Sequence, residues 1–235
     1  MNFSQSATVV PISRRCPAAS IKYTDETHDF VLRPLDLSDA KNVFDAVEIS
    51  LPALKEFLPF AHLPHTFESQ LTRIKRARSE YLEGKDFSMG LFCNKTEKFI
   101  CSAGLHPILK YNPNALDLSY WVKSEFTNKG FATLASKILI YYAFRFLECP
   151  RLQISHDENN IVSAKVVQKC GFQKEGKLRG YILPLPTRAY KDGYIASGSQ
   201  IIYSLIASDL QQLPWYHSLA NCLSFYDMLG NPHPH

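Results

Sequence analysis

A polar loop with a single glycine, residues 127–132, separates a stretch of alternating side chains from a stretch with helical spacing. Over residues 116–121 two sets of side chains alternate, which is the period of a β-strand with two different faces. Over residues 134–142 apolar side chains recur as in a helix that packs on a sheet. A helix start has unpaired N–H donors and a partial positive charge, so it binds phosphate oxygens. Because Gly130 lets the backbone approach a ligand closely, this loop predicts a pyrophosphate site.

Two common phosphate loops do not fit this segment. A dinucleotide-binding loop would read G-x-G-x-x-G and a P-loop would read G-x-x-x-x-G-K-(S/T), and neither motif surrounds Gly130. The residues present, T-N-K-G-F-A, resemble the acetyl-CoA loop of the GNAT superfamily of N-acetyltransferases, whose pattern is (Q/R)-x-x-G-x-(G/A). Thr127 departs from this pattern, in which Gln or Arg is usual. Phosphate contacts made by main-chain N–H groups would survive that change, whereas one side-chain contact would be absent.

A second motif of the same family occupies residues 157–176. It begins with D-x-x-N-x-x-S, formed by Asp157, Asn160 and Ser163, and continues after a short helix with K-C-G-F-Q-K-E-G. Together with residues 120–122 (Y-W-V) and 142–144 (Y-A-F), this segment resembles the RimJ/RimL branch of the family, which acetylates the N-termini of proteins. The resemblance extends from about residue 30 to residue 205.

The resemblance implies a fold and a division of the chain. The expected fold is the GNAT acyl-CoA N-acyltransferase fold, an α/β sandwich of mixed α+β type with a central, mixed, mostly antiparallel sheet flanked by helices. We divide the chain into a flexible N-terminal arm (residues 1–25), an acetyltransferase domain (residues 26–206) and a C-terminal extension (residues 207–235). Apolar residues make up 46% of the 235 residues, which is enough for one substantial core.

Periodicity and turn residues place the elements around the two motifs. Strands are expected at residues 30–34, 87–93, 99–106, 152–156 and 200–206 and in a stretch ending at residue 122, and helices at residues 38–51, 67–83 and 161–169 and from the glycine loop to about residue 147. Residues 181–199 and the extension exceed the family's usual length. Such segments shape a substrate groove or a subunit interface, or they pack on the core.

The resemblance also implies which residues bind acetyl-CoA as co-substrate. Main-chain N–H groups of the glycine loop would hold its phosphates, and Lys129 would add a positive charge. Asn160 would hydrogen-bond the pantetheine amides. A main-chain N–H near Trp121 or Val122 would be the oxyanion donor, where the family's central strand splays from its neighbour and offers free donors to pantetheine. The predicted cofactor-binding residues are Trp121, Val122, Thr127, Asn128, Lys129, Gly130, Phe131, Ala132 and Asn160.

Acetyl transfer to an amine requires a base for the amine proton. We predict Asp117, because many members of the family carry Asp or Glu at this position and because the strand period puts it on one face with Ser119 and Trp121. In the alternative interpretation Asp117 caps a turn or pairs with a surface lysine. His106 and Glu56 are further candidates for the base, and His106 has an ordinary pKa suited to that role.

The leaving thiolate needs a hydrogen-bond donor. The resemblance places Ser163 near the sulfur of the cofactor, so we predict that its hydroxyl is this donor. The alternative is a hydroxyl at a helix start that satisfies a backbone N–H, and both roles could hold together. The sequence contains neither H-E-x-x-H nor G-x-S-x-G, so we expect no metal and no covalent enzyme intermediate.

Composition excludes other classes of protein. No run of about 18 apolar residues is present and the start of the chain does not read as a signal peptide, so no membrane association is expected. Six scattered cysteines favour reduced thiols and a cytoplasmic location. The net charge of +4 is mild, and the basic cluster at residues 73–78 is interpreted as a solvated helix face rather than a nucleic-acid site.

The expected acceptor is the N-terminal amine of a protein. The same scaffold also serves enzymes that acetylate polyamines, aminoglycosides or amino acids, and a polycationic substrate would require a strongly acidic site. Residues 50–66 and 181–194, the predicted mouth, contain Glu56 and Asp192 as their carboxylates, against Lys55, Arg188 and Lys191. A non-catalytic acyl-CoA sensor is the alternative from another class of protein, and assembly as a homodimer is left open.

Overall fold

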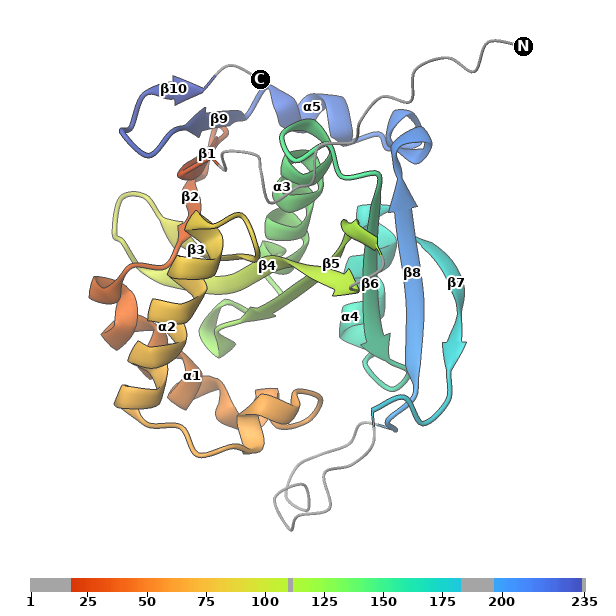
Figure 1. Cartoon of the computed structure of the whole chain (residues 1–235), viewed down its shortest axis with the longest axis horizontal. Helices are drawn as coiled ribbons and strands as arrows, with labels where there is room; N and C mark the ends of the chain where they lie inside the picture. The colour runs from red at the N-terminus through yellow and green to blue at the C-terminus, as the bar shows by residue number, and fades with distance from the viewer. Residues whose placement is uncertain (1–17, 110–111, 183–196, 234–235) are drawn as a thin grey trace.

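The computed structural model describes residues 18–109, 112–182 and 197–233. Within them a single sheet has the strand order β10-β9-β1-β2-β3-β4-β5-β6-β8-β7 (Figure 1). The strands are β1 Ser20–Thr24, β2 Asp29–Pro34, β3 Phe87–Cys93, β4 Phe99–Leu109, β5 Asn112–Val122, β6 Arg151–Asp157, β7 Gln173–Leu178, β8 Gln200–Ile206, β9 Leu223–Tyr226 and β10 Pro232–His233. Every neighbouring pair is antiparallel except β5 and β6. The predicted mixed, mostly antiparallel sheet is therefore confirmed.

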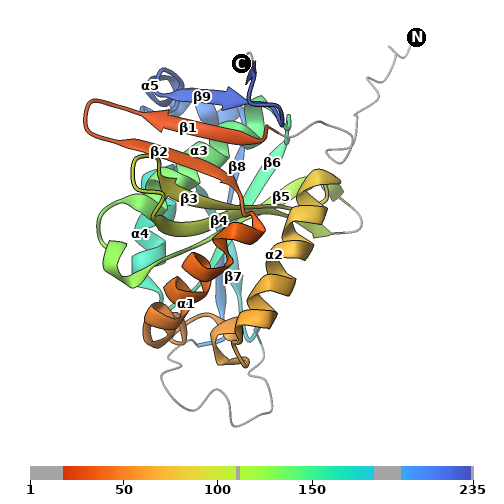
Figure 2. The ribbon, with the colours of Figure 1, turned by 90° about the vertical axis from the view of Figure 1, so that its left-hand side faces the viewer.

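Helices cover both faces of this sheet. The helices are α1 Ala40–Leu54, α2 Phe67–Leu82, α3 Phe131–Arg145, α4 Ile161–Cys170 and α5 Tyr216–Ala220. Figure 2 shows α1 and α2 on one side of β2–β4 and α3 on the other. The strand period of β5 serves both sides, because Leu118 belongs to the main core with α3, whereas Trp121 packs against the smaller cores under α1.

The central strands β5 and β6 separate after a short paired stretch. β5 pairs with β4 along most of its length, but it pairs with β6 only over residues 115–117 and 151–153. Both strands continue beyond this short ladder, β5 to Val122 and β6 to Asp157. One edge of β5 is therefore unpaired over its last residues. Because unpaired backbone groups still need hydrogen-bond partners, this edge can bind a ligand.

The structure corrects one expectation about the ends of the chain and decides between the alternatives for another. Residues 20–24 lie in the predicted flexible arm but form β1, whose Ile21 is fully buried; five residues are too few for the alternation to be recognised in the sequence. Residues 1–17 of that arm lie outside the described residues. The extension packs on the core, since Phe225 of β9 is buried and stacks on Tyr142 of α3. β7, β9 and β10 were not expected from the sequence, and most of the long segment 181–199 is not described.

Candidate functional site

The glycine loop leads directly into α3. Gly130 is the N-cap of this helix with φ of 85°, and Asn128 also has a left-handed conformation with φ of 61°. Residues 127–130 are exposed, and a Cβ added to Gly130 would meet no heavy atom within 4 Å. The first N–H groups of α3 therefore face open space, which fits an anion such as a phosphate. The backbone thus brings the six predicted loop residues, 127–132, to one helix start.

The side chains of the loop contribute less than its backbone. Thr127 Oγ1 donates to the carbonyl oxygen of Ser124 at 2.9 Å, so this hydroxyl stabilises the loop itself. Lys129 Nζ lies 5.6 Å from the ring centroid of Phe126, next to the helix start. The departure of Thr127 from the family pattern thus has a structural use, and Lys129 remains available to an anion.

The register of β4 and β5 decides which amides face the opening between β5 and β6. Lys123 N donates to the carbonyl of Ile100 at 3.0 Å, in line with the pairing of Trp121 with Ser102. Because alternate residues of an antiparallel strand direct their N–H groups to opposite sides, the Trp121 amide points to β4 and those of Tyr120 and Val122 point to the opening. Of the two amides considered from the sequence, Val122 lies at the open edge. Trp121 instead contributes its side chain, whose ring centroid lies 5.5 Å from that of Phe99.

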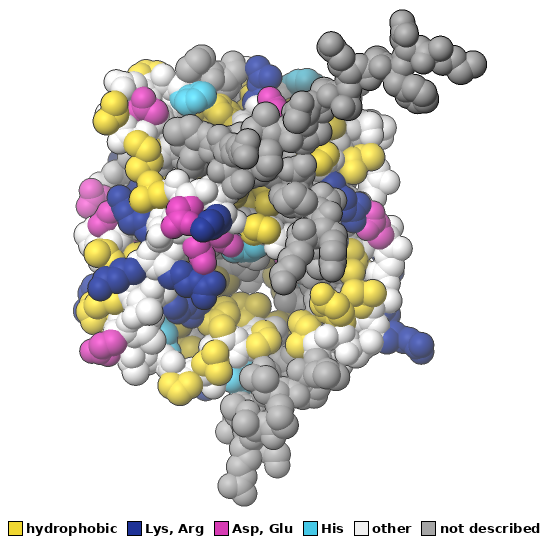
Figure 3. All heavy atoms as spheres, viewed as in Figure 1, with side chains coloured by type: hydrophobic (Ala, Val, Ile, Leu, Met, Phe, Trp, Pro, Cys, Tyr) yellow, Lys and Arg dark blue, Asp and Glu magenta, His cyan; other side chains and the backbone are white. Residues whose placement is uncertain are grey.

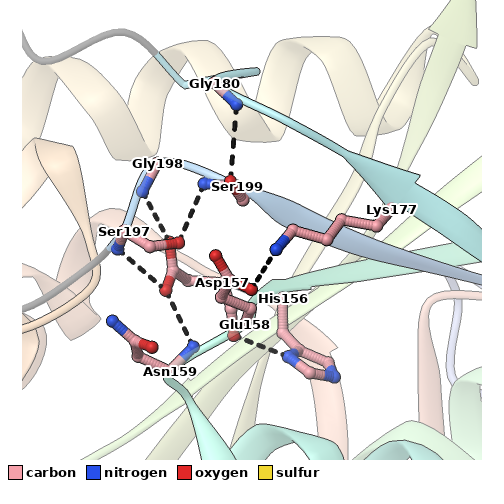
Figure 4. Close-up of polar contacts among 9 residues, drawn as sticks. All are labelled: His156, Asp157, Glu158, Asn159, Lys177, Gly180, Ser197, Gly198 and Ser199. Carbon is pink, nitrogen blue, oxygen red and sulfur yellow. Dashed lines mark hydrogen bonds and ion pairs between the residues drawn. The ribbon is translucent and has the colours of Figure 1, made fainter.

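Asp157 holds the turn that begins α4 (Figure 4). Its buried carboxylate accepts hydrogen bonds from Asn159 N at 2.9 Å, Ser197 N at 3.0 Å, Ser197 Oγ at 3.2 Å and Gly198 N at 2.9 Å. These bonds tie β6 to the chain that returns into β8. The first residue of the D-x-x-N-x-x-S motif is therefore structural, and it sets the position of the residues that follow.

Asn160 and Ser163 share the start of α4. Asn160 Oδ1 accepts from Ser163 N at 3.0 Å, so Asn160 is the helix cap and the backbone does not need the serine hydroxyl. Ser163 Oγ instead lies 2.9 Å from Tyr120 Oη of β5. Burial raises the pKa of Tyr120 to about 12, so its phenol keeps its proton at neutral pH. Tyr120 was not among the predicted site residues, and the signal for it was its place on the face of β5 opposite Asp117.

Three polar side chains form a chain of hydrogen bonds on the α1/α2 face. His106 Nδ1 lies 2.6 Å from Asp86 Oδ2, and His106 Nε2 lies 2.7 Å from Ser119 Oγ. Ser88 Oγ donates to the other carboxylate oxygen of Asp86 at 2.6 Å. Burial acts to lower the pKa of His106, but the hydrogen bond and the charge of Asp86 outweigh it, so this pKa is raised. This Asp–His–Ser chain ends at Ser119, an exposed residue of β5.

Asp117 is the direct cross-strand neighbour of His106. Burial raises the pKa of Asp117 to about 6, although the charge of His106 and a hydrogen bond from Gln153 act to lower it. A carboxylate with this pKa is ionised at neutral pH yet basic enough to accept a proton. The structure therefore brings Asp117 and His106 together on one face, whereas the third candidate, Glu56, is exposed and lines neither of the two cavities under α1 and α2.

A groove of about 280 Å³ lies between α2 and the sheet, floored by Ser88, Ser102 and Trp121. A second cavity of about 180 Å³ adjoins it and shares Val47, Phe60 and Arg73 with it. Figure 3 shows a hollow on this face, with basic side chains over α2 and apolar side chains along the lower rim. Because Ser102 is the cross-strand partner of Trp121, the groove floor runs into the row that holds Ser119 and Asp117.

Two negative findings hold for the part of the chain that the structure describes. No helix there is both long and apolar enough to cross a bilayer. No group of three or more His, Cys, Asp or Glu side chains there is arranged to hold a metal ion.

Comparisons with known proteins agree with this fold. The family model of the acetyltransferase (GNAT) domain matches residues 29–173. The "Putative ribosomal N-acetyltransferase YdaF" of Bacillus subtilis (strain 168) is 31% identical over 150 residues, 63% of this chain and 80% of that protein. The ribosomal-protein-S5-alanine acetyltransferase of Vibrio fischeri has a TM-score of 0.67 at 21% identity, covering 80% of this chain and 97% of that chain. Mycobacterium smegmatis RimJ, solved in complex with CoA-disulfide, has a TM-score of 0.70 at 19% identity, covering 90% of this chain and 97% of that chain.

Proposed function

This chain belongs to the GNAT family of acetyltransferases, and from that premise we propose that it acetylates the N-terminal amine of a protein with acetyl-CoA as co-substrate. The observation that carries the proposal is the placement of two different sets of groups on the two faces of β5. Asp117, Ser119 and His106 lie on the α1/α2 face, and Tyr120 and Ser163 meet on the other. A protein acceptor is supported by the names of the relatives, which refer to ribosomal proteins.

The cofactor would be held by backbone groups. The N–H groups at the start of α3 would bind the pyrophosphate, and the Tyr120 and Val122 amides at the open edge of β5 would bind the pantetheine arm. Lys129 would add charge at the phosphates, and the Asn160 amide group would face the same arm from the start of α4. When bound, acetyl-CoA supplies an activated carbonyl carbon, so that a C–N bond to the amine forms as the C–S bond breaks. One proton must then leave the amine, and one thiolate must be neutralised.

The proton of the amine goes to the α1/α2 face. We assign Asp117 as the base, because its pKa of about 6 leaves it ionised at neutral pH. His106 beside it, anchored by Asp86 and bonded to Ser119, provides a neighbouring positive charge and a path for the proton toward solvent. The carboxylates of Asp86, Asp117 and Glu80 outnumber the cations His106 and Arg76 beside them, so a positively charged amine would be attracted to this end of the groove.

The thiolate would be stabilised by a hydrogen bond on the opposite face. Tyr120 keeps its proton and can donate it to Ser163 Oγ, and the Ser163 hydroxyl hydrogen would then be free to bond to the departing sulfur. The nucleophile and the leaving group would thus be served from opposite sides of one strand.

Ser163→Ala is expected to lower kcat by about 10- to 100-fold, because a hydrogen bond to a charged group contributes about 1.5–3 kcal/mol. The binding of acetyl-CoA should change little, since Asn160 still caps α4 in the absence of the hydroxyl. Stopped-flow release of thiol measures the effect. Val162→Ala, in the same helical turn but exposed, is the matched control. An unchanged kcat in Ser163→Ala would remove the serine from this role.

The function itself is tested by thiol release from acetyl-CoA with a panel of amines. The panel holds peptides that begin with Ser, Ala or Met, the same peptides with blocked N-termini, spermidine, an aminoglycoside and free amino acids. We expect turnover of the unblocked peptides alone. Turnover confined to a small amine would replace the protein acceptor, and binding of acetyl-CoA without any turnover would favour an acyl-CoA sensor.

A further inference from the structure

Arg73 differs from the other arginines of α2 in its partners. Arg76 pairs with Glu80 at 2.8 Å and Arg78 pairs with Asp36 at 2.9 Å. Among the described residues Arg73 has no carboxylate partner, and its guanidinium lies over the ring of Phe60 at 5.0 Å from the centroid. Loss of water around this group lowers the pKa of Arg73, although part of its side chain remains exposed. A cation that is partly desolvated and unpaired is suited to bind an anion.

The position of Arg73 places this charge in the groove of about 280 Å³ between α2 and the sheet, which is the proposed site of the acceptor peptide. Both Arg73 and Lys75 are exposed, but Arg73 lines the groove and the smaller cavity beside it, whereas Lys75, on another face of α2, lines neither. Arg73, Ala77 and Glu80 follow one another at helical spacing along a stripe of α2 that faces the groove. The interpretation of residues 73–78 as a solvated helix face fits both residues, which are exposed, and Arg73 in addition lines the groove.

The groove is consequently polarised along α2. At one end the three carboxylates of Glu80, Asp86 and Asp117 outnumber the two cations beside them, His106 and Arg76, so the net charge there is negative. At the other end stands Arg73, seven residues and roughly 10 Å away along the helix axis. An extended peptide advances about 3.5 Å per residue. An amine at the acidic end therefore brings the side chain of the second or third residue of a peptide within reach of the guanidinium.

We propose that Arg73 binds a carboxylate of the acceptor, so that the enzyme prefers protein N-termini with Asp or Glu at the second or third residue. The inference rests on the proposed function, because it assigns the substrate class of that same groove. Phe60 below the guanidinium and Trp121 on the floor provide apolar walls for the intervening side chain. The planar, bidentate donors of an arginine match a carboxylate in geometry as well as in charge.

The test compares peptides that begin with Ser and carry Glu, Gln or Lys at positions two and three. For the wild-type protein we expect kcat/KM to be about 10-fold higher or more for Glu than for Gln, mainly through KM. Arg73→Gln should remove this preference, and Arg73→Glu should shift it toward the Lys peptides. Lys75→Gln, which removes a cation from the solvated side of α2, should keep the wild-type order. Acetyl-CoA affinity and Tm of each variant report on folding.

The outcomes separate the inference from the function. Equal kcat/KM for the Glu and Gln peptides in the wild-type protein, or a preference for Glu that survives in Arg73→Glu, would overturn the role of Arg73 and leave the acetyltransferase activity standing. Acetyl-CoA binding without turnover of any peptide would instead contradict the proposed function. A preference that Lys75→Gln also removes would assign the effect to the general positive charge of α2 and overturn the specific role of Arg73.

Discussion

Asp117→Asn is expected to lower kcat for acetyl transfer by roughly 100-fold or more, because a positioned base typically contributes 10²- to 10⁴-fold. The amide keeps the size and polarity of the side chain but cannot accept the proton of the amine. The affinity for acetyl-CoA should change little, since Asp117 lies on the face of β5 opposite Tyr120 and Ser163. Steady-state kinetics with the peptide substrate and calorimetric titration of acetyl-CoA measure the two quantities.

The pH dependence identifies the base independently. A carboxyl group accepts a proton only when it is ionised, so activity of the wild-type protein should fall as the pH drops through about 6, the raised pKa of Asp117. In Asp117→Asn this limb should disappear. If His106 were the base, the limb would lie above the ordinary histidine value, because the pKa of His106 is also raised, and it would persist in Asp117→Asn. That second result, with an unchanged kcat, would transfer the role of base to His106.

Gly130→Val is expected to weaken acetyl-CoA binding by roughly 100-fold or more, since the phosphates contribute several charge-assisted hydrogen bonds of about 1.5–3 kcal/mol each. The added side chain would occupy the open space at the start of α3, where a Cβ meets no atom of the protein. It would also disfavour the left-handed conformation, φ of 85°, that aims the first N–H groups. Calorimetry with acetyl-CoA gives the affinity, and thermal unfolding gives the change in stability.

Gly230→Val is the matched control for that substitution. Gly230 has φ of 81° and equally open surroundings, but it lies in the turn between β9 and β10. Both variants should lose a similar amount of stability from backbone strain. Only Gly130→Val should lose affinity for acetyl-CoA. Native affinity in Gly130→Val would show that the phosphates bind elsewhere.

Local patterns in the sequence were sufficient for much of the fold. The alternation at residues 116–121 predicted both faces of β5, and the glycine at residue 130 predicted the start of α3. β3 and β8 fall at the residues expected from their apolar runs. Short or polar strands were missed because few residues carry the pattern: β7 reads Q-K-E-G-K-L and is mostly exposed, and β10 has two residues.

What the sequence alone determined about this protein is the set of features that depend on neighbours a few residues apart. Gly130 turns its own loop, and the strand period separates Asp117 from Tyr120. Such features are encoded in residue type and in spacing over one or two turns of the chain, so the order of the amino acids is sufficient to predict them.

Only the tertiary structure decided which distant side chains meet. His106 contacts Asp86 and Ser119 because the register of β3, β4 and β5 aligns them, and Ser163 meets Tyr120 because α4 packs beside the open edge of β5. Arg73, although exposed, lines the groove because of the rotation of α2 against the sheet. Register and helix rotation are set by the packing of the whole core, and the reach of a side chain to a partner tens of residues away leaves no periodic mark in the sequence.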